Sequence, residues 1–250
     1  GPLQQAVDAL AAAGWCEPDA IELVEGPDEY LFGEETGLLE VVEGNLPLPR
    51  WLPPFQQGLF ATTESPDPTA VNNVETLANV PPIITNGPDW FRSIGTPESP
   101  GTKVFALAGS LRTTGLIEVP MGISLRTIVE EMAGGVADGR RFKAAQTGGP
   151  SGGCIPERFL DTPVDYEHLR ALGSIMGSGG MVVMDDTQSM PEFARFYLAF
   201  CRDESCGKCV PCRVGTVELH ALVDRLCRGE GRRGDLDRLE ALCRTVRATS

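Results

Sequence analysis

The chain has 250 residues, of which 35 are acidic and 21 are basic, so its formal net charge is −14. This acidic balance argues against a nucleic-acid-binding surface and against binding to an anionic membrane face. The sequence has no run of 18 apolar residues and no secretion signal at its start, which predicts a cytoplasmic protein without a membrane span.

The first hundred residues predict several helices and one strand. An alanine-rich helix is expected over residues 5–13, and a strand over residues 21–24 leads through a glycine turn to a second helix that begins after Gly33. Because the chain opens directly on a helix, we expect it to be cut from a larger fold. Glu34 and Glu35 stand at the start of the second helix, where acidic side chains stabilise the positive end of the helix dipole. Taken alone, their position favours a structural role.

A proline-rich segment, residues 44–68, follows and is expected to be extended and irregular. Long connections of this kind are often functional. A further helix is predicted to begin near Asn72 and Asn73, and either amide is suited to cap it.

The sequence changes in character near residue 100, which predicts a domain boundary there. Two strands, a helix and a third strand are expected in the next part of the chain, at residues 103–108, 115–119, 124–132 and 142–146. This order is typical of a small β-grasp-like module. The glycine-rich segments 148–153 and 177–180 match neither the dinucleotide fingerprint nor the P-loop spacing, so both are predicted to be loops, and residues 181–184 form a last strand.

The last part of the chain predicts three helices. The first opens on a capping box, Ser189–Glu192, and carries four aromatic side chains on one face that are expected to be core: Phe193, Phe196, Tyr197 and Phe200. The second is expected over residues 214–227 and the third over residues 236–246. Three cysteines on their apolar faces, Cys201, Cys227 and Cys243, favour burial as small hydrophobic residues.

Between the first two of these helices, Cys206, Cys209 and Cys212 form the pattern C-x2-C-x2-C. Many four-iron clusters are held at three corners by such a run, with the fourth ligand from elsewhere in the chain. A zinc site more often pairs two C-x2-C knuckles, and a redox-active C-x-x-C dithiol would not need the third cysteine. With three of the eight cysteines clustered, metal ligation is favoured over disulfides.

Six motifs occur together and in one order: Tyr30-Leu-Phe-Gly-Glu-Glu-Thr36, Pro53-Pro-Phe55, Val71-Asn-Asn-Val-Glu-Thr76, Gly148-Gly-Pro-Ser-Gly-Gly-Cys154, Met176-Gly-Ser-Gly-Gly180 and Glu204-Ser-Cys-Gly-Lys-Cys-Val-Pro-Cys-Arg213. Over nearly its whole length the chain thereby resembles the flavoprotein subunit of respiratory complex I. It equally resembles the NADH-linked subunits of NAD-dependent hydrogenases and formate dehydrogenases.

The resemblance implies a fold of class α/β plus α in three parts. These are a partial FMN- and NADH-binding α/β domain (1–100), a β-grasp-like (SLBB) domain with its connection (101–187), and a helical bundle with an iron–sulfur loop (188–250). It implies electron transfer from NADH through FMN to a 4Fe–4S cluster, and a ferredoxin-like iron–sulfur subunit as partner. The final acceptor and the choice between NAD and NADP are left open.

The resemblance also implies roles for individual residues. Glu34 would be the catalytic residue beside the flavin and the nicotinamide, with Gly33 at the same position and Glu35 against the dinucleotide. Aromatic contacts to NADH would come from Tyr30 and Phe55. The flavin phosphate and ring would be bound by Val71, Asn72, Asn73 and Thr76; amides and free N–H groups at a helix start suit a phosphate.

Two features depart from the family pattern. Its glycine-rich flavin loop, which precedes the Gly-Glu-Glu-Thr motif, is absent, and its fourth cluster cysteine would lie beyond Ser250. We therefore expect a chain truncated at both ends, with Cys243 a poor substitute ligand because of its apolar surroundings. The alternative functions are a non-catalytic iron–sulfur electron-transfer or docking module and a structural zinc domain.

Overall fold

The computed structural model describes residues 1–250. The chain forms two compact units, Gly1–Val71 and Asn72–Ser250. The helices that follow Val71 therefore group with the sheet that comes after them.

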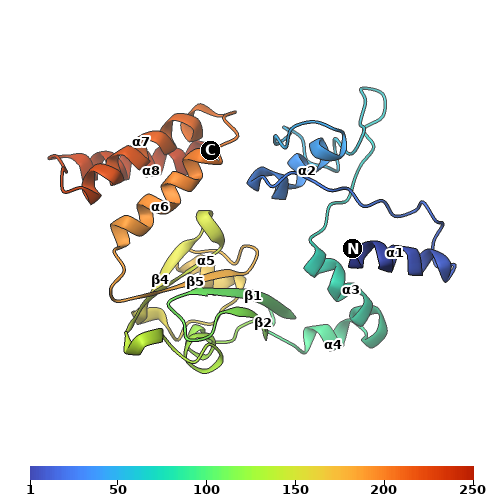
Figure 1. The fold of residues 1–250 in the computed structure, drawn as a ribbon, viewed down its shortest axis with the longest axis horizontal. Coiled ribbons are helices and arrows are strands. Elements are labelled where there is room, and N and C mark those ends of the chain that lie inside the picture. Colours follow the sequence, from blue (N-terminus) through green and yellow to red (C-terminus); the bar gives the residue numbers. More distant parts are fainter. The chain divides into compact units, whose positions relative to one another are not determined.

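The first unit contains α1 (Pro2–Ala12), the short 3-10 helix η1 (Tyr30–Gly33) and α2 (Glu35–Val42) (Figure 1). The strand predicted over residues 21–24 is wrong, because this segment is irregular and no strand of the unit pairs with it. The proline-rich segment is irregular, as predicted. It is tied to α2 by the nearly buried side chain of Arg50, whose Nε lies 2.6 Å from Glu40 and whose Nη1 donates to the carbonyl of Gly58 at 2.8 Å.

The second unit opens with α3 (Val74–Asn86) and α4 (Pro88–Arg92). Asn73 caps α3, since its side-chain oxygen accepts a hydrogen bond from the amide of Glu75 at 2.8 Å. Of the two amides that the sequence offered as caps, the structure uses the second.

A five-stranded mixed sheet follows, in the order β2-β1-β5-β3-β4. Only β1 and β5 are parallel. The strands are β1 (Thr102–Gly109), β2 (Gly115–Pro120), β3 (Phe142–Thr147), β4 (Gly153–Pro156) and β5 (Gly180–Asp185). The four predicted strands are present. The sequence did not predict β4, a short strand with glycine at one end and proline at the other.

Helical segments cover this sheet and complete its core. They are the π-helical turn η2 (Thr127–Met132), the 3-10 turns η3 (Ala137–Gly139), η4 (Gly149–Ser151) and η5 (Glu157–Phe159), and α5 (Tyr166–Ala171). The helix predicted over residues 124–132 thus ends in the wider π form. The most deeply buried side chains are Phe105, Leu125, Ile128, Ile155, Leu169 and Met181.

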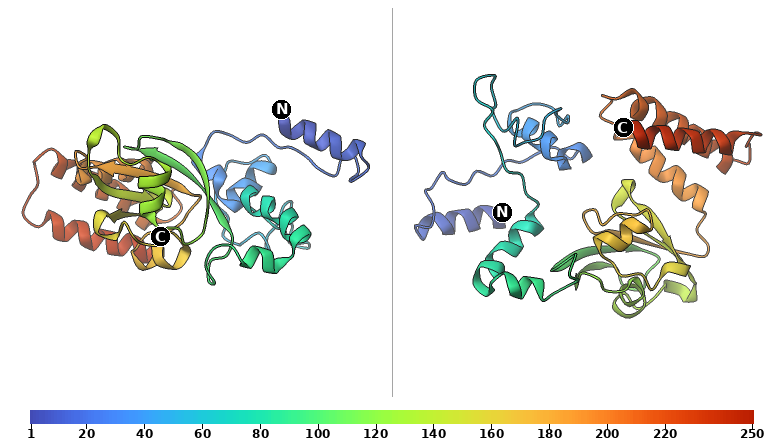
Figure 2. Two further views of the ribbon diagram at one scale, coloured as in Figure 1. Left: turned by 90° about the horizontal axis from the view of Figure 1, so that it is seen from below. Right: turned by 180° about the vertical axis from the view of Figure 1, so that it is seen from behind.

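Three longer helices end the chain: α6 (Met190–Asp203), α7 (Val210–Cys227) and α8 (Asp235–Thr249). They lie side by side in both views of Figure 2. Ser189 caps α6 as predicted. The core assignment of the aromatic face of α6 is wrong, because none of its residues is buried and Phe196 is 68% exposed. The core assignment of Cys243 is also wrong, because its side chain is exposed. No helix has both the length and the apolar character that crossing a bilayer requires.

Candidate functional site

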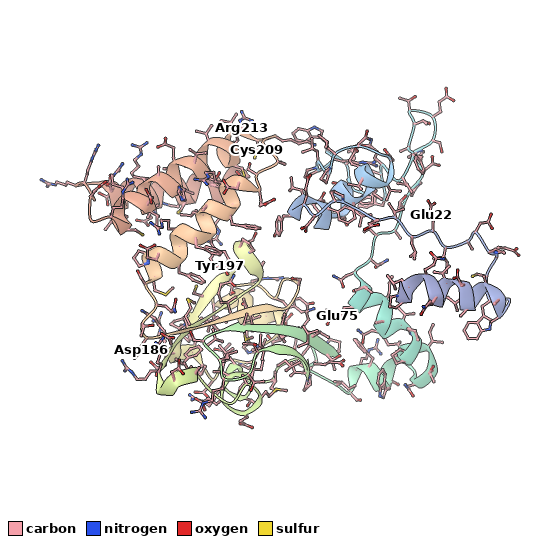
Figure 3. All side chains as sticks on the ribbon, in the orientation of Figure 1. Glu22, Glu75, Asp186, Tyr197, Cys209 and Arg213 are labelled. Carbon is pink, nitrogen blue, oxygen red and sulfur yellow. The ribbon has the colours of Figure 1, made fainter.

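The cysteine loop lies between α6 and α7, and the structure places two of its thiols at the start of α7. Cys209 is the residue before the helix, and Cys212 lies in its first turn, because α7 begins at Val210 rather than at the predicted Val214. A proline at the second helical position, Pro211, is tolerated because its missing N–H has no partner within the helix. Figure 3 shows Cys209 and Arg213 at this end of the helix.

This position stabilises a thiolate. The pKa of Cys209 is lowered, first by a hydrogen bond from the backbone of Cys212 and then by the hydroxyl of Ser250 at the end of α8. Unpaired N–H groups and the positive end of the helix dipole favour negative charge at this point. The second of these contacts also shows that the end of α8 lies against the cysteine loop.

Polar contacts shape the loop around the thiols. The hydroxyl of Ser205 lies 3.3 Å from the sulfur of Cys212, and the guanidinium of Arg213 donates to the carbonyl of Gly207 across the turn. Gly207 has a φ of 75°, a backbone conformation that glycine adopts at little cost. The cation of Arg213 therefore lies beside the loop.

All three cysteines are partly exposed, and none forms a disulfide. No three side chains of the chain converge closely enough to form a closed metal-binding group. The structure brings Cys209 and Cys212 together, since Cys212 hydrogen-bonds to the Cys209 thiol. The donor set itself fits an iron–sulfur cluster, because three accessible thiols in one loop at a helix start can all act as thiolate ligands.

Sequence reasoning assigned Cys201 on α6 to the core. In the structure it is half-buried, and its pKa is raised by burial and then by the neighbouring Cys212. Next to it, Arg202 lies 3.2 Å from the ring of His220 on α7. The periodicity of α6 alone could not have shown that these residues border the cysteine loop.

Four of the predicted nucleotide contacts lie in η1 and at the start of α2, in the first unit. Tyr30 and Gly33 belong to η1, and both are exposed. Glu34 caps α2: its Oε2 accepts hydrogen bonds from the amides of Thr36 and Gly37 at 3.0 and 2.8 Å. Glu35 is the first residue of α2, and its side chain is exposed. The carboxylate of Glu34 therefore caps the helix and is also partly accessible.

The remaining predicted contacts lie elsewhere. Phe55 is 66% exposed in the irregular segment that follows α2. Val71 ends the first unit, whereas Asn72, Asn73 and Thr76 belong to the second unit, where they are exposed at the start of α3.

The second unit contains a cavity of about 730 Å³ beside the start of α3. It lies between α3, α4 and the strands β1 and β2, and Asn73 and Glu75 contribute to its wall. Its size falls in the range of small-molecule sites. No sequence pattern indicated this cavity, because its walls come from segments that are distant in the chain.

Comparison with family models identifies both ends of the chain. Residues 2–82 match the Nuo51 FMN-binding domain, and residues 192–250 match the iron–sulfur binding region of NADH-ubiquinone oxidoreductase-F.

Curated relatives match over most of the chain. The NADP-reducing hydrogenase protein HndC of Solidesulfovibrio fructosivorans is 53% identical over 92% of this chain and 46% of its own length. The second NADH-quinone oxidoreductase F protein of Rhizobium meliloti is 46% identical over 90% of this chain and 53% of its own. The chain spans about half the length of these relatives.

Among solved structures, an NAD⁺-reducing [NiFe]-hydrogenase in the air-oxidized state matches with a TM-score of 0.81 and 34% identity. The match covers 96% of this chain and 40% of the hydrogenase chain.

Proposed function

The chain belongs to the family of NADH-quinone oxidoreductase F proteins and their hydrogenase relatives, and from this premise we propose that it is part of a flavoprotein subunit that passes electrons from NADH through FMN to a 4Fe–4S cluster. FMN supplies the step from two-electron hydride chemistry to single-electron transfer. The observation that carries the proposal is the three-thiol loop at the start of α7, within the matched iron–sulfur region.

In this proposal Cys206, Cys209 and Cys212 supply three cluster ligands. The helix start and the guanidinium of Arg213 offset their negative charge. The hydrogen bond between Ser250 and Cys209 brings the end of α8 to the loop, where a fourth ligand would have to lie. Cys243 is a poor candidate for the fourth ligand because its exposed side chain lies on α8 seven positions before Ser250.

The nucleotide side of the proposal uses the first unit and the start of α3. Capping α2 holds the Glu34 carboxylate in one place, which suits a group that acts beside the flavin and the nicotinamide. Tyr30 and Phe55 expose aromatic faces for NADH, with Gly33 and Glu35 between them in the chain. Val71, Asn72, Asn73 and Thr76 take the flavin, and the exposed N–H groups of α3 suit its phosphate.

The domain assignment follows the same family pattern. Residues 1–100 form part of the FMN- and NADH-binding domain, residues 101–187 a β-grasp-like (SLBB) domain, and residues 188–250 an iron–sulfur helical bundle. The five-stranded mixed sheet and the three packed helices support the second and third assignments. The expected partner is a ferredoxin-like iron–sulfur protein, in a complex that places this chain at its periphery.

Anaerobic reconstitution with iron and sulfide tests the cluster. We expect broad visible absorption and, after reduction, a paramagnetic resonance signal. Serine at Cys206, Cys209 or Cys212 should abolish both, whereas serine at Cys227, a partly exposed thiol near the end of α7, should leave both unchanged. A colourless chain that binds zinc instead would refute the cluster.

Reduction of a dye by NADH tests the flavin function. The chain with added FMN should show little turnover because the family's glycine-rich flavin loop is absent from it, whereas the complete gene product should turn over. Absence of both flavin and NADH-dependent activity from the complete gene product would leave the iron–sulfur module as the only function.

A further inference from the structure

We infer that Lys103 is a positioning residue for the flavin-binding start of α3, on which it acts through Glu75. The ammonium group of Lys103, on β1, binds Oε2 of Glu75, which lies in the first turn of α3. The lysine side chain is 9% exposed and the glutamate side chain 25%. Figure 3 shows Glu75 at the start of α3, facing the sheet. The inference rests on the proposed function, since it concerns how that site is held in place.

The second oxygen of Glu75 binds the strand itself. Its Oε1 accepts a hydrogen bond from the amide of Val104 at 2.7 Å. The pairing of β1 with β5 begins only at Ala106, whose amide donates to the carbonyl of Gly179. Val104 and Ala106 point their amides to the same side of β1, so the Glu75 carboxylate takes the place of a missing strand neighbour. A buried amide without such a partner would be costly.

Glu75 is close in sequence to the predicted flavin contacts Asn73 and Thr76. The amide of Glu75 is bound by the side chain of Asn73, and Thr76 is the next residue in the chain. The side chain of Asn79 in turn donates to the carbonyl of Glu75 at 2.8 Å. Because both carboxylate oxygens are anchored to β1, the first turn of α3 is fixed relative to the sheet, and with it the amides that would meet the flavin phosphate.

The same region also accounts for the glycine at position 179. Gly179 has a φ of 93°, and a β-carbon at this position would collide with the carbonyl of Val104 and approach Lys103 Cε to 3.3 Å. The lysine stem therefore needs glycine beside it in order to reach Glu75. Lys103 shares the buried face of β1 with Phe105 and Leu107, where a charged side chain requires a partner such as the Glu75 carboxylate.

The test combines hydrogen exchange with FMN binding in the complete gene product. K103M should accelerate amide exchange in peptides covering residues 73–80 by at least about tenfold, because it leaves the Glu75 carboxylate without its counter-charge. Peptides covering β5 should exchange at an unchanged rate. FMN affinity, measured by quenching of flavin fluorescence, should fall by a similar factor. K103R retains the charge and should restore most of both properties.

Two control substitutions distinguish loss of the Lys103–Glu75 ion pair from a general effect of removing a charge. Lys143 also lies on a strand of the sheet and binds the carbonyl of Gln188, and Glu118 lines the same cavity as Glu75 but accepts from Thr102. K143M and E118Q should change neither measurement, whereas E75Q should change both. Unchanged exchange in K103M, or faster exchange with unaltered FMN affinity, would overturn the inference while the proposed function stands. Failure of the unaltered protein to bind FMN would overturn the proposed flavin site, and this inference with it.

Discussion

The guanidinium of Arg50 lies 2.8 Å from the carboxylate of Glu43, and its side chain is only 5% exposed. Arg50 is in the proline-rich segment and Glu43 follows α2, so the pair joins the two parts of the first unit. The pKa of Glu43 is raised by partial burial but lowered more by Arg50 and by the backbone of Phe60, so that it is lowered overall. The irregular segment is thus held in place by one buried cation rather than by regular secondary structure.

Replacing this cation should destabilise the first unit. R50M leaves Glu40, Glu43 and the carbonyl of Gly58 without their shared donor, and we expect a loss of about 3 kcal/mol in the free energy of unfolding. Urea denaturation followed by the fluorescence of the neighbouring Trp51 measures it. R92M, which removes an exposed cation 3.5 Å from Asp89, should change stability by less than about 0.5 kcal/mol. Equal effects of the two substitutions would contradict this role for Arg50.

Two substitutions of Glu34 distinguish a structural role of this residue from a catalytic one. E34Q retains an oxygen that can cap α2, so stability should be nearly unchanged, whereas E34A should cost about 1 kcal/mol. If Glu34 acts beside the flavin, E34Q should still slow NADH oxidation by the complete gene product, measured as dye reduction at saturating NADH. Full activity in E34Q would restrict this residue to capping.

Asp185 should make the second unit sensitive to acid. It is 2% exposed and accepts hydrogen bonds from the hydroxyl and the amide of Thr187, which hold the pKa of its carboxyl well below the usual range. Because the folded-state pKa is lowered, this stabilisation is present above the unfolded-state pKa of about 4 and is lost as the pH falls below it.

Thermal unfolding between neutral pH and pH of about 3 tests this assignment. The melting temperature of D185N should be lower at neutral pH and should fall less on acidification than that of the unaltered chain. Parallel curves for the two proteins would show that Asp185 does not carry the acid sensitivity.

Gly179 lies so close to Val104 that adding a β-carbon should strongly reduce the free energy of unfolding. G179A combines an unfavourable φ of 93° with a collision against the carbonyl of Val104, and we expect a loss of about 3 kcal/mol. Gly139 has a φ of 67° but no atom near an added β-carbon, so G139A isolates the backbone term, about 1 kcal/mol. The difference between the two in urea denaturation measures the packing contribution, and a difference of zero would exclude it.

The exposed thiol of Cys243 gives a direct test of the fourth ligand. C243S should retain the iron content and the visible spectrum after reconstitution, since this exposed side chain lies on α8, outside the cysteine loop. Loss of iron in C243S, without loss of the folded state as judged by circular dichroism, would identify Cys243 as a ligand.

Much of this protein could be derived from its sequence because the relevant signals are local. Alternating apolar residues predicted the strand that contains Phe105, Ser189 predicted the start of α6, and the spacing of Cys206, Cys209 and Cys212 predicted one three-thiol loop. Each of these depends on neighbours within a few positions, where backbone geometry decides which side chains share a face.

The tertiary structure decided what depends on partners distant in the chain. Residues 21–24 have strand-like composition but no partner strand, and the aromatic face of α6 leaves Phe196 exposed because its helix neighbours do not cover it. The burial of Arg50 and the pairing of Lys103 with Glu75 join segments that no local pattern connects. Desolvation and ion pairing act through space, so only the folded chain could show which of its charged side chains are buried and paired.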